Sequence, residues 1–323
     1  MSEVTGATGF TARKAEAIIK EISRVVVGQY DFLEKIVIAL LSGGHILIEG
    51  VPGIGKTLAA RVLAKVIKAD FKRVQFTPDL MPADITGTMV YDSSANKFYF
   101  KKGPLFTNIL LVDEINRTPP KTQSALLESM EEGTVTIDGV THVLEKPYMV
   151  IATQNPLEYE GTYPLPEAQL DRFMMKLVAG YIPQRFENML LEKFNMGFDS
   201  SNIEEMELNA VCDYSDILRC REEIRNVRVN PEIINYITTI ARLTRNSPSI
   251  MLGASPRAEI ALLLCSKTYA AMQERDFVIP EDVKDLAVPV LRHRIIIRPE
   301  AGIDGISSDD AILNVLSKVE VPR

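Results

Sequence analysis

Residues 50–57 combine glycines, a lysine and a threonine at a spacing that suits phosphate binding. They read Gly-Val-Pro-Gly-Ile-Gly-Lys-Thr and fit the pattern G-x-x-x-x-G-K-[ST]. The glycines allow backbone N–H groups to turn toward phosphate oxygens, and the following helix offers its free N-terminal N–H groups to the same anion. Lys56 is expected to reach the β- and γ-phosphates of ATP, and Thr57 to bind Mg²⁺. A chance glycine-rich turn is the alternative, but a predicted strand before the motif and a predicted helix after it favour phosphate binding.

Polar residues follow two apolar runs further along the chain. Asp113 and Glu114 end the run 108–112, and Asn155 follows the run 148–152. Ligands collect at the carboxyl ends of parallel strands. We expect Asp113 to coordinate Mg²⁺ through water, Glu114 to activate the attacking water and Asn155 to orient it. Adjacent carboxylates also begin helices and Asn-Pro also begins turns, but the phosphate loop favours the catalytic interpretation.

Two arginines are candidates for binding phosphate charge. Arg172 follows the predicted helix 166–170, and a solvated pair with Asp171 is an equally good explanation of it. Arg257 follows Ser255-Pro256, so it lies in the first turn of a predicted helix, where a cation opposes the helix dipole. That small cost indicates a second role such as gripping phosphate, with a contact to Glu259 as the alternative.

Strands and helices must alternate to position these residues. Short β-rich runs and helical patterns alternate up to about residue 182, which predicts right-handed βαβ units and a parallel sheet covered on both faces. The expected strands are 45–49, 73–76, 108–112, 148–152 and 174–177, and the expected helices are 11–25, 31–41, 57–68 and 119–132.

Two insertions interrupt this alternation. Asp138-Gly139 lies between two β-rich runs and predicts a hairpin with a type I′ turn. The second insertion, 80–105, contains the aromatic run 98–100.

The pattern changes to helices after residue 182. Helical segments are expected near 216–225, 231–244, 256–273 and 280–291, several with proline near the first turn. We therefore predict a flexible segment at 1–12, an α/β nucleotide-binding core at 13–182, and a linker with an all-helical lid domain at 183–323.

Composition excludes several classes of protein. The 323 residues have a net charge of −7, with −2 in residues 1–180 (19 basic, 21 acidic) and −5 in 181–323 (17 basic, 22 acidic), so no basic excess indicates a nucleic-acid binder. The longest apolar run, 36–41, is too short to span a membrane, and no secretory signal is visible. Cys212, Cys220 and Cys265 are expected to be buried free thiols in a reducing cytoplasm. The three histidines share no metal spacing, and residues 292–298 predict a charged strand edge.

Two long motifs then give the chain a family resemblance. Residues 113–117 with 119–132, and residues 152–156 with 161–173, are similar to signatures of the AAA+ ATPases and, within them, of the MoxR family. The resemblance covers nearly the whole chain from residue 26 to residue 294.

The resemblance implies the AAA+ strand order, with the helical region as a lid over the nucleotide. Asn155 is similar to the sensor 1 residue, Arg257 to sensor 2, and Arg172 to the arginine finger that acts on a neighbouring subunit's ATP. Arg117 is expected at the subunit junction. The two insertions resemble those of a clade with a displaced lid, so Arg257 is open to action on either subunit. The residues expected to bind ATP are Val27, Gly28, Gln29, Pro52, Gly53, Ile54, Gly55, Lys56, Thr57, Leu58 and Arg257.

The resemblance also implies a homo-oligomeric ring, expected to be hexameric, that remodels, assembles or activates protein clients in a chaperone-like way, often with a von Willebrand A-domain partner. The alternatives are a nucleic-acid motor, the ATPase subunit of a metal chelatase, and a small-molecule kinase. A GTPase is disfavoured because no Asn-Lys-x-Asp motif occurs.

Overall fold

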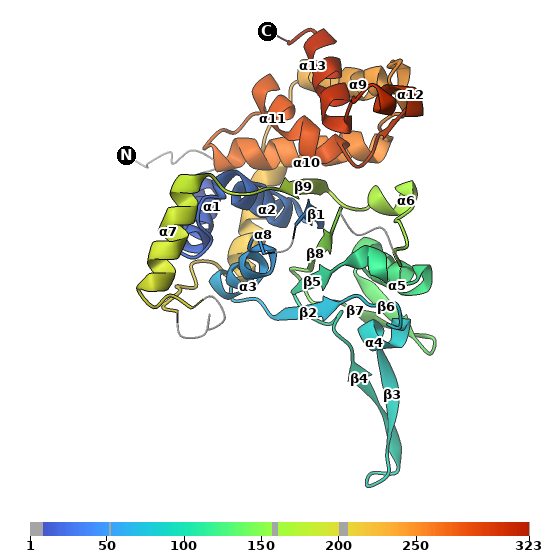
Figure 1. Ribbon diagram of the computed structural model, residues 1–323. Helices are drawn as coiled ribbons and strands as arrows, with labels where there is room; N and C mark the ends of the chain where they lie inside the picture. Colours follow the sequence, from blue (N-terminus) through green and yellow to red (C-terminus); the bar gives the residue numbers. More distant parts are fainter. Residues whose placement is uncertain (1–8, 52, 157–160, 200–205, 323) are drawn as a thin grey trace.

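A five-stranded parallel sheet forms the centre of the molecule. The computed structural model describes residues 9–51, 53–156, 161–199 and 206–322. The strand order is β2-β5-β8-β1-β9, and every pairing is parallel (Figure 1). The strands are β1 (Ile46–Gly50), β2 (Phe71–Gln75), β5 (Ile109–Asp113), β8 (Met149–Gln154) and β9 (Met175–Ala179). The predicted α/β fold is confirmed.

Alternate side chains of the strands enter two separate hydrophobic cores, because successive residues of a strand point to opposite faces. Leu111 packs with helices α1 (Gly9–Ser23), α2 (Tyr30–Ser42) and α3 (Lys56–Val66). Leu110, its neighbour in β5, packs instead with α4 (Pro82–Thr86) and α5 (Pro120–Glu132). Both faces are therefore covered, which explains why the central strands are apolar throughout.

Each of the two predicted insertions contains an antiparallel hairpin. Strands β6 (Thr134–Ile137) and β7 (Val140–Val143) are joined by Asp138 and Gly139, with φ of 47° and 80°. Positive φ at both turn residues is what a type I′ turn requires. Strands β3 (Gly87–Asp92) and β4 (Lys97–Lys102) form a second hairpin that projects away from the sheet (Figure 1).

The first helix extends into the segment that was predicted to be flexible. Helix α1 begins at Gly9, and Thr11 is fully buried. Its N–H and its hydroxyl both donate to the carboxylate of Glu223, at 2.9 and 2.8 Å. The apolar spacing that begins at Ala15 did not reveal this anchor, because Glu223 lies 212 residues further along the chain.

Helices dominate the chain after β9. Those α-helices are α7 (Gln184–Asn195), α8 (Tyr214–Asn226), α9 (Pro231–Asn246), α10 (Pro256–Met272), α11 (Pro280–Leu291), α12 (Pro299–Ile303) and α13 (Ser308–Lys318). A short antiparallel pair, β10 (Ile250–Leu252) and β11 (Ile296–Ile297), accompanies them. Two short helices occur earlier, η1 (Ile115–Arg117) and α6 (Glu167–Leu170). In the described part of the chain, no helix is both long and apolar enough to span a membrane.

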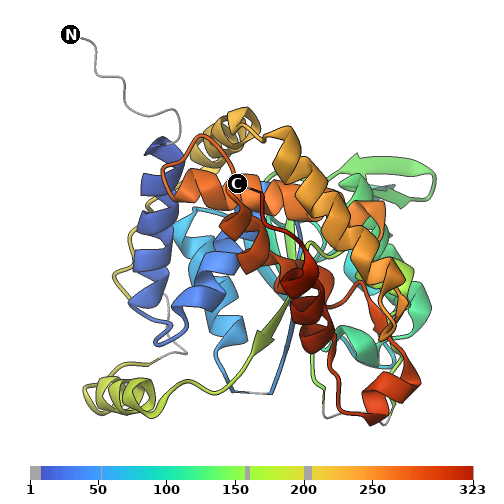
Figure 2. The ribbon, with the colours of Figure 1, turned by 90° about the horizontal axis from the view of Figure 1, so that it is seen from above.

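These helices occupy three different places. Helices α9 to α13 form a layer over one edge of the sheet (Figures 1 and 2). Helix α7 lies apart from that layer, at the side of the molecule (Figure 2). Helix α8 packs against the core as well as against the helical layer: Asp216 pairs with Lys14 of α1 at 2.7 Å, and Ile217 lies in the hydrophobic cluster that includes residues of α1, α2 and α10. The helical region is thus not one continuous unit in space.

Candidate functional site

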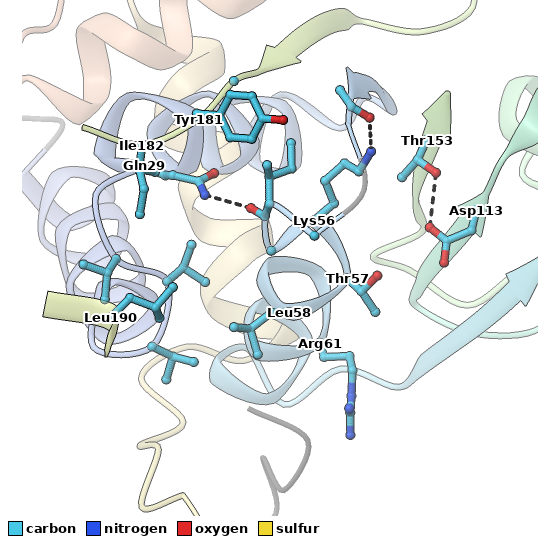
Figure 3. A pocket seen from close by; sticks show the side chains of 18 of the residues that line it. Gln29, Lys56, Thr57, Leu58, Arg61, Asp113, Thr153, Tyr181, Ile182 and Leu190 are labelled. Carbon is cyan, nitrogen blue, oxygen red and sulfur yellow. Dashed lines mark hydrogen bonds between the residues drawn. The ribbon is translucent and has the colours of Figure 1, made fainter. Parts of the chain in front are cut away.

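A cavity of about 740 Å³ lies at the carboxyl end of the sheet. It is lined by the β1–α3 loop, by residues that end β2, β5 and β8, and by two segments near residues 25–29 and 180–198. Figure 3 shows Lys56 and Thr57 in the middle of this space. Asp113 and Thr153 lie on one side of them, and Leu190 lies on the opposite side.

The β1–α3 loop has the backbone that phosphate binding requires. Gly53 and Gly55 have φ of 85° and 84°, a region that residues with a side chain rarely adopt. Gly55, the N-cap residue of α3, has no side chain that could cap the N–H groups of the first helical turn. Residues 53–58, all predicted to bind ATP, line the cavity. Pro52 lies outside the described residues.

Lys56 bends over the loop that carries it. Its Nζ donates to the carbonyl oxygen of Gly50 at 2.5 Å (Figure 3). Burial lowers the pKa of this lysine, and the negative charges of Asp113 and Glu114 act in the opposite direction. A partly desolvated ammonium group attracts an anion more strongly than one in water, whereas the two carboxylates repel an anion and attract a cation.

The two carboxylates are held by residues of neighbouring strands. Asp113 is buried; its Oδ1 accepts from the hydroxyl of Thr153 at 3.1 Å, and its Oδ2 accepts from Nε of Arg73 at 2.6 Å. The N–H of Glu114 donates to the same hydroxyl at 3.0 Å. The ends of β2, β5 and β8 are therefore joined by one hydrogen-bonded network.

Glu114 has a left-handed backbone, with φ 57° and ψ 52°. This conformation is unfavourable for a residue with a side chain, and such strain is concentrated at functional sites. Its Oε2 accepts from Nε2 of Gln75 at 2.7 Å and from a guanidinium nitrogen of Arg117 at 2.9 Å. Arg73, in the middle of β2, and Gln75, at its end, also line the cavity, although they were not predicted as site residues; their sequence signal is only their position on a strand of the sheet.

The other end of the cavity is apolar. Val25, Val26 and Val27 line it from one side, and Leu190 and Phe194 of α7 line it from the other. Sequence reasoning missed α7, whose residues are all at least partly exposed. An apolar cleft of this kind suits a flat heteroaromatic ring.

The segment 27–29 closes this end of the cavity. Nε2 of Gln29 donates to the carbonyl oxygen of Ile54 at 2.8 Å, which links the segment to the β1–α3 loop (Figure 3). Val27 and Gln29 line the cavity, whereas Gly28 lies beneath Phe186. A Cβ at Gly28 would be 2.6 Å from Cγ of Phe186, and its φ is 77°, so only glycine fits.

Asn155 lines the cavity just beyond the end of β8, but Arg172 and Arg257 do not line it. Both arginines bind one carboxylate, that of Glu131 at the end of α5. Arg172 pairs with Oε2 at 2.9 Å and also donates to the carbonyl oxygen of Leu127 at 2.7 Å. Arg257 pairs with Oε1 at 2.5 Å. The structure therefore brings the two predicted arginines together, away from the cavity of their own chain.

The simpler partners considered for these arginines are contradicted. Asp171 pairs with Arg294 rather than with Arg172, and Glu259 pairs with Arg245 rather than with Arg257. The prediction of a charged strand edge at 292–298 is also wrong for Arg294, whose side chain is only 2% exposed. The sequence did not reveal this burial, because the carboxylate that pairs with Arg294 belongs to Asp171, 123 residues earlier in the chain.

The remaining titratable candidates are structural. His45 is buried; its Nε2 donates to the carbonyl oxygen of Met130 and its Nδ1 accepts from the N–H of Val150. Burial lowers the pKa of His45 to about 4. The cysteines Cys212, Cys220 and Cys265 are buried free thiols, as predicted, and burial raises the pKa of each.

Comparison with known proteins gives two family matches along the chain. Residues 45–175 match the ATPase family associated with various cellular activities (AAA), and residues 242–315 match the AAA lid domain. The uncharacterized protein YeaC of Bacillus subtilis is 49% identical over 304 residues, which cover 94% of this chain and 93% of that protein.

Two further relatives match nearly the whole of this chain. Chaperone MoxR1 of Mycobacterium tuberculosis is 40% identical over 329 residues, covering 98% of this chain and 85% of that protein. The crystal structure of a candidate ATPase from Cytophaga hutchinsonii has a TM-score of 0.89 and 42% identity, and the match covers 98% of this chain and 97% of that one. Because the alignment with Chaperone MoxR1 extends through both the sheet and the lid, this chain belongs to the MoxR family of AAA+ ATPases.

Proposed function

We propose that the protein binds Mg-ATP in the 740 Å³ cavity and hydrolyses its γ-phosphate. The observation that carries this proposal is the arrangement of the cavity itself. The phosphate loop lies between an apolar end that suits adenine and a polar end that contains Asp113 and Glu114. Phosphoryl transfer needs mainly positioning and electrostatic stabilisation, and both are available there.

The donor set fits a magnesium ion. Mg²⁺ prefers oxygen ligands and retains several waters, so it needs few protein groups. The hydroxyl of Thr57 and the carboxylate of Asp113 face the same cavity and would hold the ion. When bound, Mg²⁺ would neutralise part of the negative charge of the phosphates.

Glu114 is the proposed general base. It accepts a proton from a water whose oxygen attacks the γ-phosphorus, while the bond from that phosphorus to the bridging oxygen of ADP breaks. Gln75 and Arg117 orient its carboxylate by donating to Oε2. Asn155 is proposed to orient the same water, and Lys56 to stabilise the charge on the phosphate oxygens.

Arg172 and Arg257 are proposed to act on the nucleotide of a neighbouring subunit. Neither lines the cavity of its own chain, and both are partly exposed beside Glu131. An exposed pair of guanidinium groups is suited to a phosphate presented from outside the chain. This arrangement supports a homo-oligomeric ring, for which six subunits are proposed.

The energy of hydrolysis is proposed to drive remodelling, assembly or activation of protein clients, with a von Willebrand A-domain protein as the partner class. The name of the relative Chaperone MoxR1 supports this role. The projecting β3–β4 hairpin exposes Tyr91, Phe98 and Tyr99, which are residue types common at protein interfaces. The acidic balance of the chain disfavours a nucleic-acid motor.

The test is ATP hydrolysis per subunit, measured as protein concentration rises without an added partner. The proposal expects a rate that climbs and then saturates as neighbours complete each site. The Lys56→Ala variant is the background control and should remain inactive throughout. A substantial rate that does not change with concentration would show a self-contained site and would contradict the role of neighbouring arginines.

A further inference from the structure

Arg294 makes an unusually complete set of hydrogen bonds between the helical layer and the core. It follows α11, and its side chain is 2% exposed. Its NH1 donates to the carbonyl oxygens of Met174 and Val290, at 2.9 and 2.5 Å. Its NH2 donates to the carbonyl oxygens of Asp171 and Phe173, at 3.1 and 2.6 Å. Nε donates to Oδ1 of Asp171 at 2.7 Å.

These bonds fix the backbone on both sides of Arg172. Asp171 precedes that residue and Phe173 follows it, and the carbonyl oxygens of both accept from the same guanidinium nitrogen. The neighbouring His293 also contributes, because its Nε2 lies 2.9 Å from the carbonyl oxygen of Phe173. Arg172 itself does not contact Arg294 in any of these bonds, so Arg294 acts on it through the main chain.

Asp171 extends the same network to the second arginine. Its Oδ2 accepts from the hydroxyl of Ser255 at 2.9 Å. Ser255 is the N-cap residue of α10, and Arg257 lies in the first turn of that helix. The buried guanidinium of Arg294 and the carboxylate of Asp171 therefore connect the backbone segments that carry Arg172 and Arg257. The carboxylate of Glu131 pairs with the guanidinium groups of the same two side chains.

The exposed ion pairs of Glu131 and the buried hydrogen bonds of Arg294 differ in strength. Glu131 and its partners are 30–46% exposed, so water screens these pairs, and the pairs hold the two guanidinium groups only loosely. The guanidinium group of Arg172 also donates to the carbonyl oxygen of Leu127. Arg294 is buried and hydrogen-bonded through all three guanidinium nitrogens, where such bonds are strong and costly to break. The buried hydrogen bonds of Arg294 therefore fix the backbone positions of Arg172 and Arg257. The exposed ion pairs with Glu131 leave the guanidinium groups of both residues available to a phosphate.

We propose that Arg294, through Asp171, is the positioning residue that makes Arg172 and Arg257 a single two-arginine site. This site would bind the γ-phosphate of the ATP held by a neighbouring subunit. This inference rests on the proposed function, in which those two arginines act between subunits. Arg294 touches neither nucleotide nor the reacting atoms in this scheme. Its effect is to couple the orientation of the lid to that of the core at the subunit boundary.

The test uses Arg294→Lys in the full-length protein, because lysine keeps the charge but cannot reproduce the planar fork of donors. Alone, this variant should hydrolyse ATP roughly 10- to 100-fold more slowly, the effect typical of a misplaced catalytic group. Its Kd for a fluorescent ATP analogue should stay within about twofold of the parent value, because its own cavity is intact. Asp171→Asn retains the shape and should show the same split, which keeps the test usable if Arg294→Lys folds poorly.

Mixing experiments separate positioning from a general structural role. Arg294→Lys is combined with Lys56→Ala, which lacks its own phosphate-binding lysine but presents intact arginines. Turnover should rise on mixing, once differently tagged chains are shown to co-purify. Arg275→Lys is the matched control, since Arg275 forms a bidentate pair with buried Asp282 of the lid but no bond of this network. It should retain the parent rate.

Arg172→Ala, mixed in the same way, distinguishes the two levels of the proposal. If Arg172→Ala recovers on mixing and Arg294→Lys does not, the positioning role is wrong and the proposed function stands. Failure of both variants to recover in proven mixed oligomers would overturn the action of arginines between subunits and this inference with it. Weak ATP binding by Arg294→Lys, with parent-like binding by Arg275→Lys, would also overturn the positioning role.

Discussion

Replacement of Glu114 by glutamine separates nucleotide binding from hydrolysis. In the structure, Oε2 of Glu114 accepts hydrogen bonds from Gln75 and Arg117, at 2.7 and 2.9 Å. The carbonyl oxygen of a glutamine can accept the same two bonds, and the residue keeps its size, so the cavity should retain its shape. The change removes the basicity of the side chain. General-base catalysis contributes roughly 10²- to 10⁴-fold, or about 3–5 kcal/mol of barrier.

We therefore expect Glu114→Gln to bind ATP with a Kd close to that of the parent and to lose roughly 10²- to 10⁴-fold in kcat. Phosphate release in the steady state gives kcat, and a fluorescent ATP analogue gives Kd. The matched control is Glu145→Gln, which removes the same charge from an exposed position and should leave both values unchanged. Normal hydrolysis by Glu114→Gln would refute the assignment of the base.

Two further predictions concern binding and stability. Gly28→Ala should lower the free energy of unfolding by at least about 2 kcal/mol, from positive φ and contact with Phe186, and should weaken ATP binding because Phe186 anchors α7. Gly133 has a φ of 64° but no atom near its Cβ position, so Gly133→Ala should show the effect of backbone strain alone in urea unfolding and nucleotide titration. Equal losses of stability and of ATP binding in both variants would exclude the Phe186 contact as the cause. Burial lowers the pKa of His45 to about 4 in the folded protein, against 6.5 normally, so as pH falls the unfolded chain binds a proton at this histidine before the folded chain does. The free energy of unfolding therefore decreases as pH falls from 6.5 toward 4. Urea unfolding should show about 2 kcal/mol of this loss between pH 7 and pH 5, which His45→Gln should remove; an unchanged pH slope in that variant would contradict the buried neutral state.

The sequence by itself determined the features that depend on neighbours in the chain. The glycine-rich loop between a strand and a helix, the strand-end positions of Asp113 and Glu114, and the hairpin at Asp138-Gly139 were all predicted correctly in position, because glycine conformation, hydrogen-bond donors and strand periodicity act over a few residues. The parallel sheet also followed, since strands that alternate with helices have few ways to pair. The roles proposed for these residues stay predictions.

Only the tertiary structure decided how distant residues combine. Arg257 and Glu131 are 126 residues apart, and Arg294 and Asp171 are 123 apart, so no local pattern indicates that they meet. The same holds for α8, which follows the core in sequence but packs into it through contacts with α1. Charged residues at 292–298 look alike in the sequence. One of them is buried because the fold delivers a carboxylate and four carbonyl oxygens to its side chain, and burial of a charge is favourable only where such partners are supplied.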